Sequence, residues 1–155
     1  MARKIQLAVD VGHRALRAAK IRPGRRTSLA ATVFEAIPDS VASDDAAAIG
    51  AALGAAMGRA GLGVGPAVFA LDRSMTSFKR LELPTDDLDE LPEMVQIAVE
   101  RELPIDAEDA VIDFSIIERT AGGFVVEAVA VPRREIERIH AIADAAGLKV
   151  ARIAP

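Results

Sequence analysis

Hydrophobic and polar positions alternate with a period of two along the first part of the chain. The stretch LAVDVGHRALRAAKI, from Leu7 to Ile21, carries two alternating runs on either side of Gly12. This pattern predicts a strand, a tight turn and a returning strand. A proline-glycine turn follows at 23–26, and residues 28–37 have the composition of a third strand. We therefore expect three consecutive antiparallel strands.

A helical period replaces the alternation after residue 43. The acidic stretch at 43–45 can cap the first turn of a helix that ends near residue 60. Three apolar residues at intervals of four form the predicted buried stripe: Ile49, Leu53 and Met57. Three glycines repeat one position further on: Gly50, Gly54 and Gly58. Glycines inside a helix cost about 1 kcal/mol each relative to alanine. We expect a close approach of this helix to a sheet to offset that cost.

An uncharged run, AVFAL at 67–71, has the character of a strand buried on both faces, and we expect it to join the first sheet. A strand, helix and strand in this order are typical of an α/β layer. The polar stretch 72–77 then marks a boundary between two parts of the chain.

The second part of the chain again changes between the strand period of two and the helical period. It predicts a strand at 78–83, a helix from Leu91 to before Pro104, and two strands at 111–118 and 124–131. The glycine pair 122–123 suits the hairpin between those strands. A helix at 133–146, stopped by Gly147, and a last strand at 149–154 complete the chain.

Composition narrows the possible functions. The 155 residues are 51% hydrophobic but only 3% aromatic, and they contain no cysteine and two histidines far apart. The core must therefore be aliphatic, and base stacking, disulfides, thiolate chemistry and a zinc cluster are all disfavoured. We expect no nucleic-acid partner, and no apolar run is long enough to predict a membrane helix.

Charge is distributed unevenly. Residues 1–30 contain eight basic side chains against the single acid Asp10, a net charge of +7, whereas the whole chain carries −4, so the remainder carries −11. The basic end is either a solvated hairpin face or a surface for lipid headgroups or a phosphate.

Asp10 and Gly12 form the motif with the most chemical content. An acid at the end of a buried strand needs a cation or hydrogen-bond donors nearby. Without a β-carbon at Gly12, the backbone N–H groups of the turn could hold an anion, with Asp10 beside it to take a hydrated cation. The alternative is an ordinary hairpin with a capped turn, because D-x-G is short and frequent.

Four segments occur in an order that resembles the PilM family of type IV pilus assembly proteins, which is similar in fold to actin and FtsA. These segments are LAVDVGHRALRAAKI, AVFALDRSMTSFKRLELP, LPEMVQIAVERELPIDAEDAVIDFSII and VVEAVAVPRREIERIHAIADAAGLKVARIAP. The resemblance covers nearly the whole chain and corresponds to the N-terminal half of the family.

The resemblance implies an α/β protein with half of an actin-like, ribonuclease H-like fold. Residues 1–72 plus 148–155 would form the actin-like subdomain, and residues 73–147 the inserted strand-helix-strand-strand-helix lobe of PilM and FtsA. It also implies a cytoplasmic protein, peripheral at the inner membrane, that binds Mg-ATP between its halves and holds the cytoplasmic tail of a bitopic partner, PilN, between subdomain and lobe.

The family's nucleotide residues carry over only in part. Asp10 matches the acid that reaches magnesium through water, and Gly12 matches the glycine of the first phosphate loop. His13 and Arg14 stand where small hydroxyl residues are usual, and Arg17 where lysine is common; Arg14 could compensate by pairing with phosphate. A second phosphate loop is needed from the other half, and no second D-x-G occurs. We expect either a fragment or a protein that has kept only the partner-binding half.

Two functions of different class follow. The first is a non-catalytic scaffold of a type IV pilus or type II secretion platform, binding a partner's tail, other platform subunits or a second copy of itself. Its candidate groove residues, each of which also suits local core, are Phe78, Leu81, Leu83, Pro104 and Ile105. The second is a nucleotide-binding fragment of an actin-like ATPase or kinase, motivated by Asp10, Gly12 and the basic hairpin. Four further acids are expected on solvated faces: Glu100, Glu102, Asp113 and Glu127.

Overall fold

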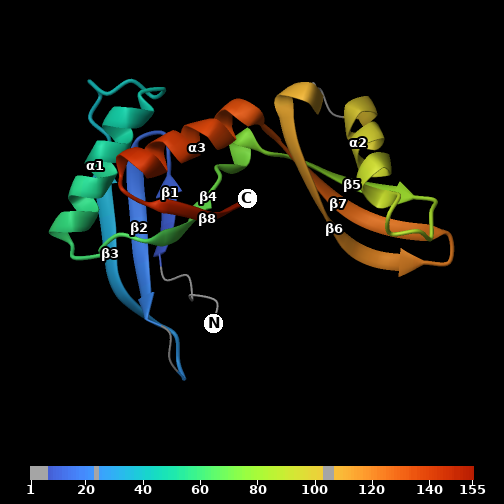
Figure 1. The fold of residues 1–155 in the computed structure, drawn as a ribbon, viewed down its shortest axis with the longest axis horizontal. Coiled ribbons are helices and arrows are strands. Elements are labelled where there is room, and N and C mark those ends of the chain that lie inside the picture. The colour runs from blue at the N-terminus through green and yellow to red at the C-terminus, as the bar shows by residue number, and fades with distance from the viewer. Residues whose placement is uncertain (1–6, 23–24, 103–106) are drawn as a thin grey trace. The chain divides into compact units, whose positions relative to one another are not determined.

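The computed structural model describes residues 7–22, 25–102 and 107–155 (Figure 1). The chain divides into two compact units. The larger unit runs to Asp72 and takes in Glu137–Pro155, and the smaller unit is Arg73–Ile136.

A five-stranded sheet, in the order β3-β2-β1-β4-β8, forms the larger unit. Strands β1 (Leu7–Val11), β2 (Ala15–Arg22) and β3 (Ser28–Ala36) are antiparallel neighbours, which confirms the predicted meander. Strands β4 (Pro66–Ala70) and β8 (Lys149–Ala154) continue the sheet parallel to β1. The expectation that residues 67–71 join the first sheet is also confirmed.

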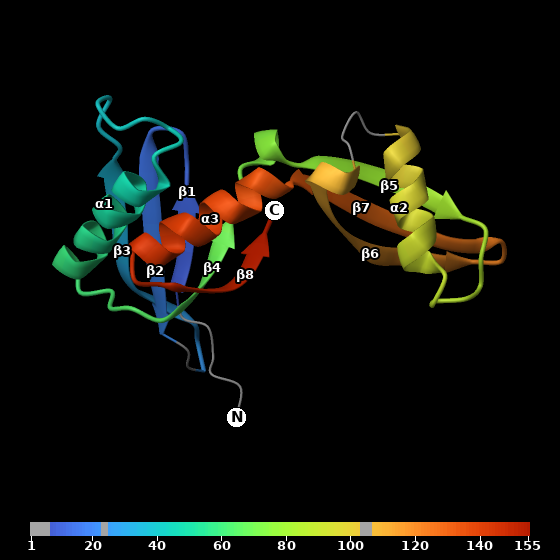
Figure 2. The same ribbon diagram turned by 45° about the horizontal axis from the view of Figure 1, so that its top comes forward.

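Two helices cover one face of this sheet, α1 (Ala46–Arg59) and α3 (Arg133–Ala145), as Figure 2 shows. The N–H of Ala48 donates to the carboxylate of Asp45 at 2.9 Å, so the acidic stretch caps α1 as predicted. The predicted stripe Ile49, Leu53 and Met57 is at most 2% exposed. It packs with the inward side chains of the strands and of α3, among them Leu16, Phe69 and Ile142, which are fully buried.

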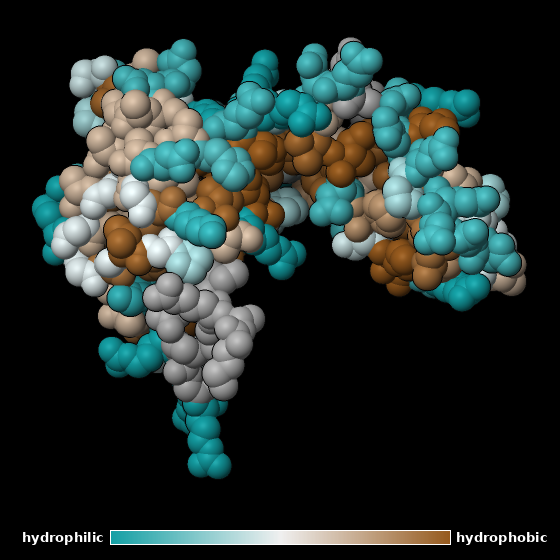
Figure 3. All heavy atoms as spheres, viewed as in Figure 1, coloured by the Kyte–Doolittle hydropathy of each residue, from teal (hydrophilic) through white to brown (hydrophobic). Residues whose placement is uncertain are grey.

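Two of the three glycines of α1 lie against α3 or the residue that follows it, and not against the sheet. A β-carbon placed at Gly50 would lie 2.5 Å from the carbonyl oxygen of Ile142 and 2.6 Å from Cβ of Ala145. At Gly54 the nearest atom would be the carbonyl oxygen of Ala146, at 3.2 Å, and at Gly58 nothing lies within 4 Å. The expected approach to a sheet is therefore wrong, because the apolar stripe occupies the side of α1 that faces the strands. Figure 3 shows α1 as a pale surface, because many of its exposed residues are alanine and glycine.

Strand β4 is covered on one face only. Ala67 and Phe69 are fully buried, whereas Val68 is half-buried and Ala70 is exposed. The expectation of burial on both faces is thus not met in the described residues, because both helices of the larger unit pack on the same side of the sheet.

The smaller unit is a three-stranded antiparallel sheet under one helix. Strands β5 (Ser77–Leu83), β7 (Gly123–Pro132) and β6 (Ala110–Thr120) lie in that order, and α2 (Leu91–Glu102) covers one face. A short 3₁₀ turn precedes each of two strands: η1 (Arg73–Met75) comes before β5, and η2 (Ala107–Asp109) comes before β6. Gly123 has φ of 137°, and a side chain there would collide with the carbonyl oxygen of Leu83, so glycine is required at the hairpin.

Most of α3 belongs to the larger unit, whereas the resemblance placed residues 137–147 in the inserted lobe. Ile139, Ile142 and Ala143 are at most 5% exposed within the core of the larger unit. The guanidinium of Arg138 donates to the carbonyl oxygen of Ser43 through Nε at 3.1 Å and Nη2 at 2.9 Å. The apolar face of α3 therefore packs within the larger unit, and the boundary between the two compact units falls at Ile136.

Candidate functional site

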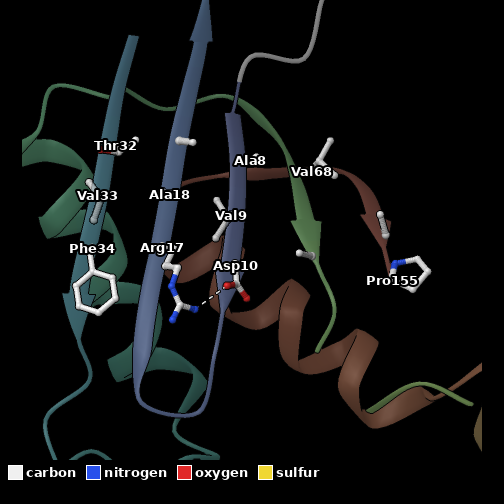
Figure 4. Close-up of a pocket in the computed structure, with 13 residues that line it drawn as sticks. Ala8, Val9, Asp10, Arg17, Ala18, Thr32, Val33, Phe34, Val68 and Pro155 are labelled. Carbon is white, nitrogen blue, oxygen red and sulfur yellow. Dashed lines mark hydrogen bonds and ion pairs between the residues drawn. The ribbon is translucent and has the colours of Figure 1, made fainter. Parts of the chain in front are cut away.

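Asp10 and Arg17 form an ion pair on the open face of the larger unit's sheet. They are register partners across β1 and β2. Nη1 of Arg17 donates to Oδ2 of Asp10 at 2.8 Å, drawn as a dashed line in Figure 4, and the two side chains are 54% and 40% exposed. The cation that Asp10 requires at the end of its strand is thus supplied by the neighbouring strand.

The turn at Gly12 closes as a hairpin. Its N–H donates to the carbonyl oxygen of Ala15 at 3.0 Å, and a β-carbon at Gly12 would lie 3.2 Å from that oxygen. His13 and Arg14 are exposed in the turn, and the carbonyl oxygen of Arg14 accepts from the N–H of Ile37 at 2.9 Å. The five predicted nucleotide residues do lie at one end of this hairpin.

Two contacts of the hairpin bear on the Mg-ATP site predicted around Asp10 and Gly12, which stays a prediction. The position beside the Asp10 carboxylate, where a hydrated magnesium would bind, holds the guanidinium of Arg17. The N–H of Gly12, one of the turn's N–H groups predicted to hold an anion, is bonded within the hairpin. The geometry matches the ordinary hairpin that the sequence left open as the alternative.

A pocket of about 420 Å³ lies on the same open face, between β3 and the end of β8. Its floor consists mainly of small apolar side chains, and its polar atoms come from Thr32 and the Asp10–Arg17 pair (Figure 4). Phe34 lines one side and is 69% exposed, with the guanidinium carbon of Arg17 at 5.5 Å from its ring centre. Sequence reasoning missed Phe34; the available signal was an aromatic residue at a solvent-facing position of an alternating strand.

The basic hairpin lies away from Asp10. Asp10 lies opposite Arg17 near the start of β2, whereas Arg22 is the last residue of β2 and Arg25 and Arg26 lie beyond it. Arg17 and Arg22 are five positions apart along the strand, which corresponds to about 17 Å. The basic hairpin and the D-x-G turn therefore do not combine into one phosphate site.

The three predicted groove residues that the structure describes, Phe78, Leu81 and Leu83, do not form one surface. Leu81 and Leu83 are 3% and 6% exposed and belong to the core beneath α2, together with Val95. Phe78 points to the other face of β5, because successive residues of a strand alternate, and it is half-buried with Arg73 at 5.5 Å from its ring centre. Pro104 and Ile105 lie outside the described residues.

The four further acids that the sequence singled out are exposed to solvent. Glu100, Glu102, Asp113 and Glu127 are exposed, as expected, and Glu102 pairs with Nζ of Lys79 at 2.6 Å. Within residues 7–22, 25–102 and 107–155 no group of three metal-ligating side chains gathers. Among those same residues, no helix has the length and hydrophobicity that crossing a membrane requires.

Two solved structures share this arrangement. One, described as the PilM-PilN type IV pilus biogenesis complex, has a chain that matches 96% of this chain over 47% of its own, with a TM-score of 0.83 and 19% identity. The other is the cytoplasmic domain of EpsL, an inner membrane component of the type II secretion system of Vibrio cholerae. It matches 96% of this chain over 56% of its own, with a TM-score of 0.68 and 18% identity.

The likeness confirms the actin-like fold and the PilM-like arrangement that the sequence motifs predicted. The chain spans about half the length of the solved chains that it matches. No protein-family model matches the chain, and no curated protein does.

Proposed function

We propose that this chain is a cytoplasmic scaffold module of a type IV pilus platform, or of the related type II secretion platform, and that it binds the cytoplasmic tail of a bitopic membrane protein resembling PilN. The observation that carries the proposal is the match to the PilM-PilN structure, which extends over 96% of this chain and therefore includes both units. A fold alone hosts many functions, so the proposal depends on binding experiments.

The contacts of the described residues support a binding role over a catalytic one. Asp10 is paired with Arg17, and the four acids considered in the smaller unit, Glu100, Glu102, Asp113 and Glu127, are exposed. Phosphoryl transfer needs bound phosphate, metal and a group that orients the attacking oxygen. The proposal therefore assigns the chain a structural role in the platform, peripheral at the inner membrane through its partner, with other subunits or a second copy as further contacts.

Among the groove candidates that the structure describes, Phe78 is the one available to a partner. It is half-buried and lies outside the core beneath α2. Phe34 of the larger unit is a matched control, because each phenylalanine has an arginine guanidinium at 5.5 Å from its ring centre. The two substitutions Phe78→Ala and Phe34→Ala thus remove the same ring, in each case from beside one arginine.

The test is titration of the purified chain with a peptide comprising the cytoplasmic tail of the PilN-like protein from the same organism. We expect Phe78→Ala to weaken the dissociation constant by about 30-fold, the effect of losing an aromatic anchor worth about 2 kcal/mol. Phe34→Ala should leave it within about twofold. Absence of binding by the unsubstituted chain contradicts the scaffold proposal, and equal effects of the two substitutions remove Phe78 from the binding surface.

The nucleotide alternative is tested separately by calorimetry with Mg-ATP, using Asp10→Ala as the paired control. The proposal expects no saturable heat in either protein. Saturable binding that disappears with Asp10→Ala would mean that Arg17 yields its place beside the carboxylate, and it would favour the nucleotide-binding function.

A further inference from the structure

One end of the larger unit's sheet gathers basic side chains from two separate parts of the sequence. The register places Lys20 opposite Leu7, Leu7 opposite Ala67, and Ala67 opposite Val150. The end of β2 and the beginnings of β1, β4 and β8 therefore lie in one row. Five basic residues occupy this end: Lys20, Arg22, Arg25, Arg26 and Lys149.

The segments that carry these five residues contain no acidic side chain. The strands and loops of this end, residues 19–32, 60–67 and 147–150, contain no aspartate or glutamate. Four of the five side chains are exposed and Lys20 is half-buried. None of the five takes part in an ion pair between described residues, whereas Arg17 and Arg59 of the same unit both do. These five residues thus form a basic surface at this end of the sheet, which we call the basic end.

A hollow of about 320 Å³ lies within the basic end, lined by Lys20 and Arg22 on one side and Ala60 and Gly61 on the other. The register of β2 and β3 shifts between Lys20 and Ile21, and α1 stops at Ala60 before Gly61 turns with φ of 67°. Two cations therefore face a hollow that has small groups on its opposite side. Such a site suits the phosphate of a headgroup.

Two exposed aliphatic side chains flank the cations. Leu29 lies opposite Ile21 on the hairpin and is 63% exposed, and Val64, in the loop that leads into β4, is 76% exposed. Figure 1 shows β2 and β3 extending beyond the other strands at this end. The basic end thus combines unpaired positive charge with aliphatic groups that water disfavours.

We propose that the basic end binds the surface of a bilayer containing anionic lipids. Lys20 and Arg22 hold a lipid phosphate in their hollow, Arg25, Arg26 and Lys149 lie in the negative surface potential, and Leu29 and Val64 enter the boundary between headgroups and acyl chains. The net charge of the remaining chain is negative, so the same potential orients the molecule with this end toward the membrane.

A bilayer explains the surface better than a nucleic acid does. Both provide phosphates, but only a bilayer provides an apolar layer for Leu29 and Val64. A single-stranded nucleic acid would call for aromatic stacking, and the residues of the basic end are not aromatic. This contact adds to the partner-mediated membrane location of the proposed function and does not require the partner.

The experiment is flotation of the whole purified chain with protein-free vesicles, of phosphatidylcholine alone or of phosphatidylcholine with phosphatidylglycerol. We expect binding to the anionic vesicles only, decreasing as salt is raised. Each basic side chain near such a surface strengthens binding about fivefold, so Arg25→Ala combined with Arg26→Ala should weaken partitioning about 25-fold. Both side chains are exposed and outside the strands, so folding should persist, as circular dichroism will verify.

The matched control removes two exposed arginines of the smaller unit, Arg101→Ala with Arg134→Ala, and thus changes net charge equally. It should shift partitioning by less than twofold. Leu29→Ser should weaken the binding that persists at high salt, where charge is screened. Equal loss in both double variants, equal binding to neutral vesicles, or competition by inorganic phosphate or by single-stranded DNA at matched ionic strength would overturn the proposal. Because no partner protein is present, failure here leaves the tail-binding proposal standing.

Discussion

The two faces of the five-stranded sheet differ in how far their side chains are buried. On the covered face, Leu16 and Phe69 are fully buried beneath α1 and α3. On the open face, Phe34 is 69% exposed and the Asp10–Arg17 pair is solvated. Most of the stability of the larger unit therefore comes from the covered face, whereas the open face is available for contacts with ligands or protein.

The largest expected effect concerns two phenylalanines on opposite faces. Phe69→Ala removes a fully buried ring and should lower the free energy of unfolding by about 3–5 kcal/mol, because it loses apolar burial and leaves a cavity. Phe34→Ala should cost less than about 1 kcal/mol, since the ring is exposed and loses only its contact with Arg17. Urea unfolding followed by circular dichroism measures both. Similar costs would mean that the open face is covered in solution.

The second prediction compares the stability changes caused by replacing two glycines of α1. Gly50→Ala places a methyl group 2.5 Å from the carbonyl oxygen of Ile142. The strain of overpacking, about 1–3 kcal/mol, should exceed the gain in helix propensity of about 1 kcal/mol. Gly58→Ala meets nothing within 4 Å and should stabilise the protein by up to about 1 kcal/mol.

Thermal unfolding of the two variants checks these opposite signs. A stabilising Gly50→Ala would show that α1 and α3 can move apart without loss, and that the close approach is not needed for packing.

The smallest effect concerns the ion pair of the open face. In a double-mutant cycle, Asp10→Ala and Arg17→Ala should couple by about 0.2–1 kcal/mol, because both side chains are substantially solvated. The coupling should fall when salt is added. A coupling several times larger, insensitive to salt, would indicate that the pair is buried against another part of the protein in solution.

Local sequence predicted the elements well and the sites poorly. The order of strands and helices, the cap at Asp45 and the glycine stop at Gly147, with φ of 70°, were all predictable because each depends on neighbouring residues. The partner of Asp10 was not, since Arg17 meets it only through the register of the hairpin. Leu81 and Leu83 were equally ambiguous, because an apolar position in a strand suits a groove or a core.

The sequence by itself determined which residues share a face of each strand and helix, because the periods of 2 and 3.6 follow from backbone geometry. Only the tertiary structure decided which face of the sheet the helices cover, that Gly50 of α1 packs on α3, and that α3 belongs mainly to the larger unit. It also assembled the basic end, by placing Lys149 at the same end of the sheet as Lys20 and Arg22. These outcomes depend on contacts between residues far apart in the chain, which no local period encodes.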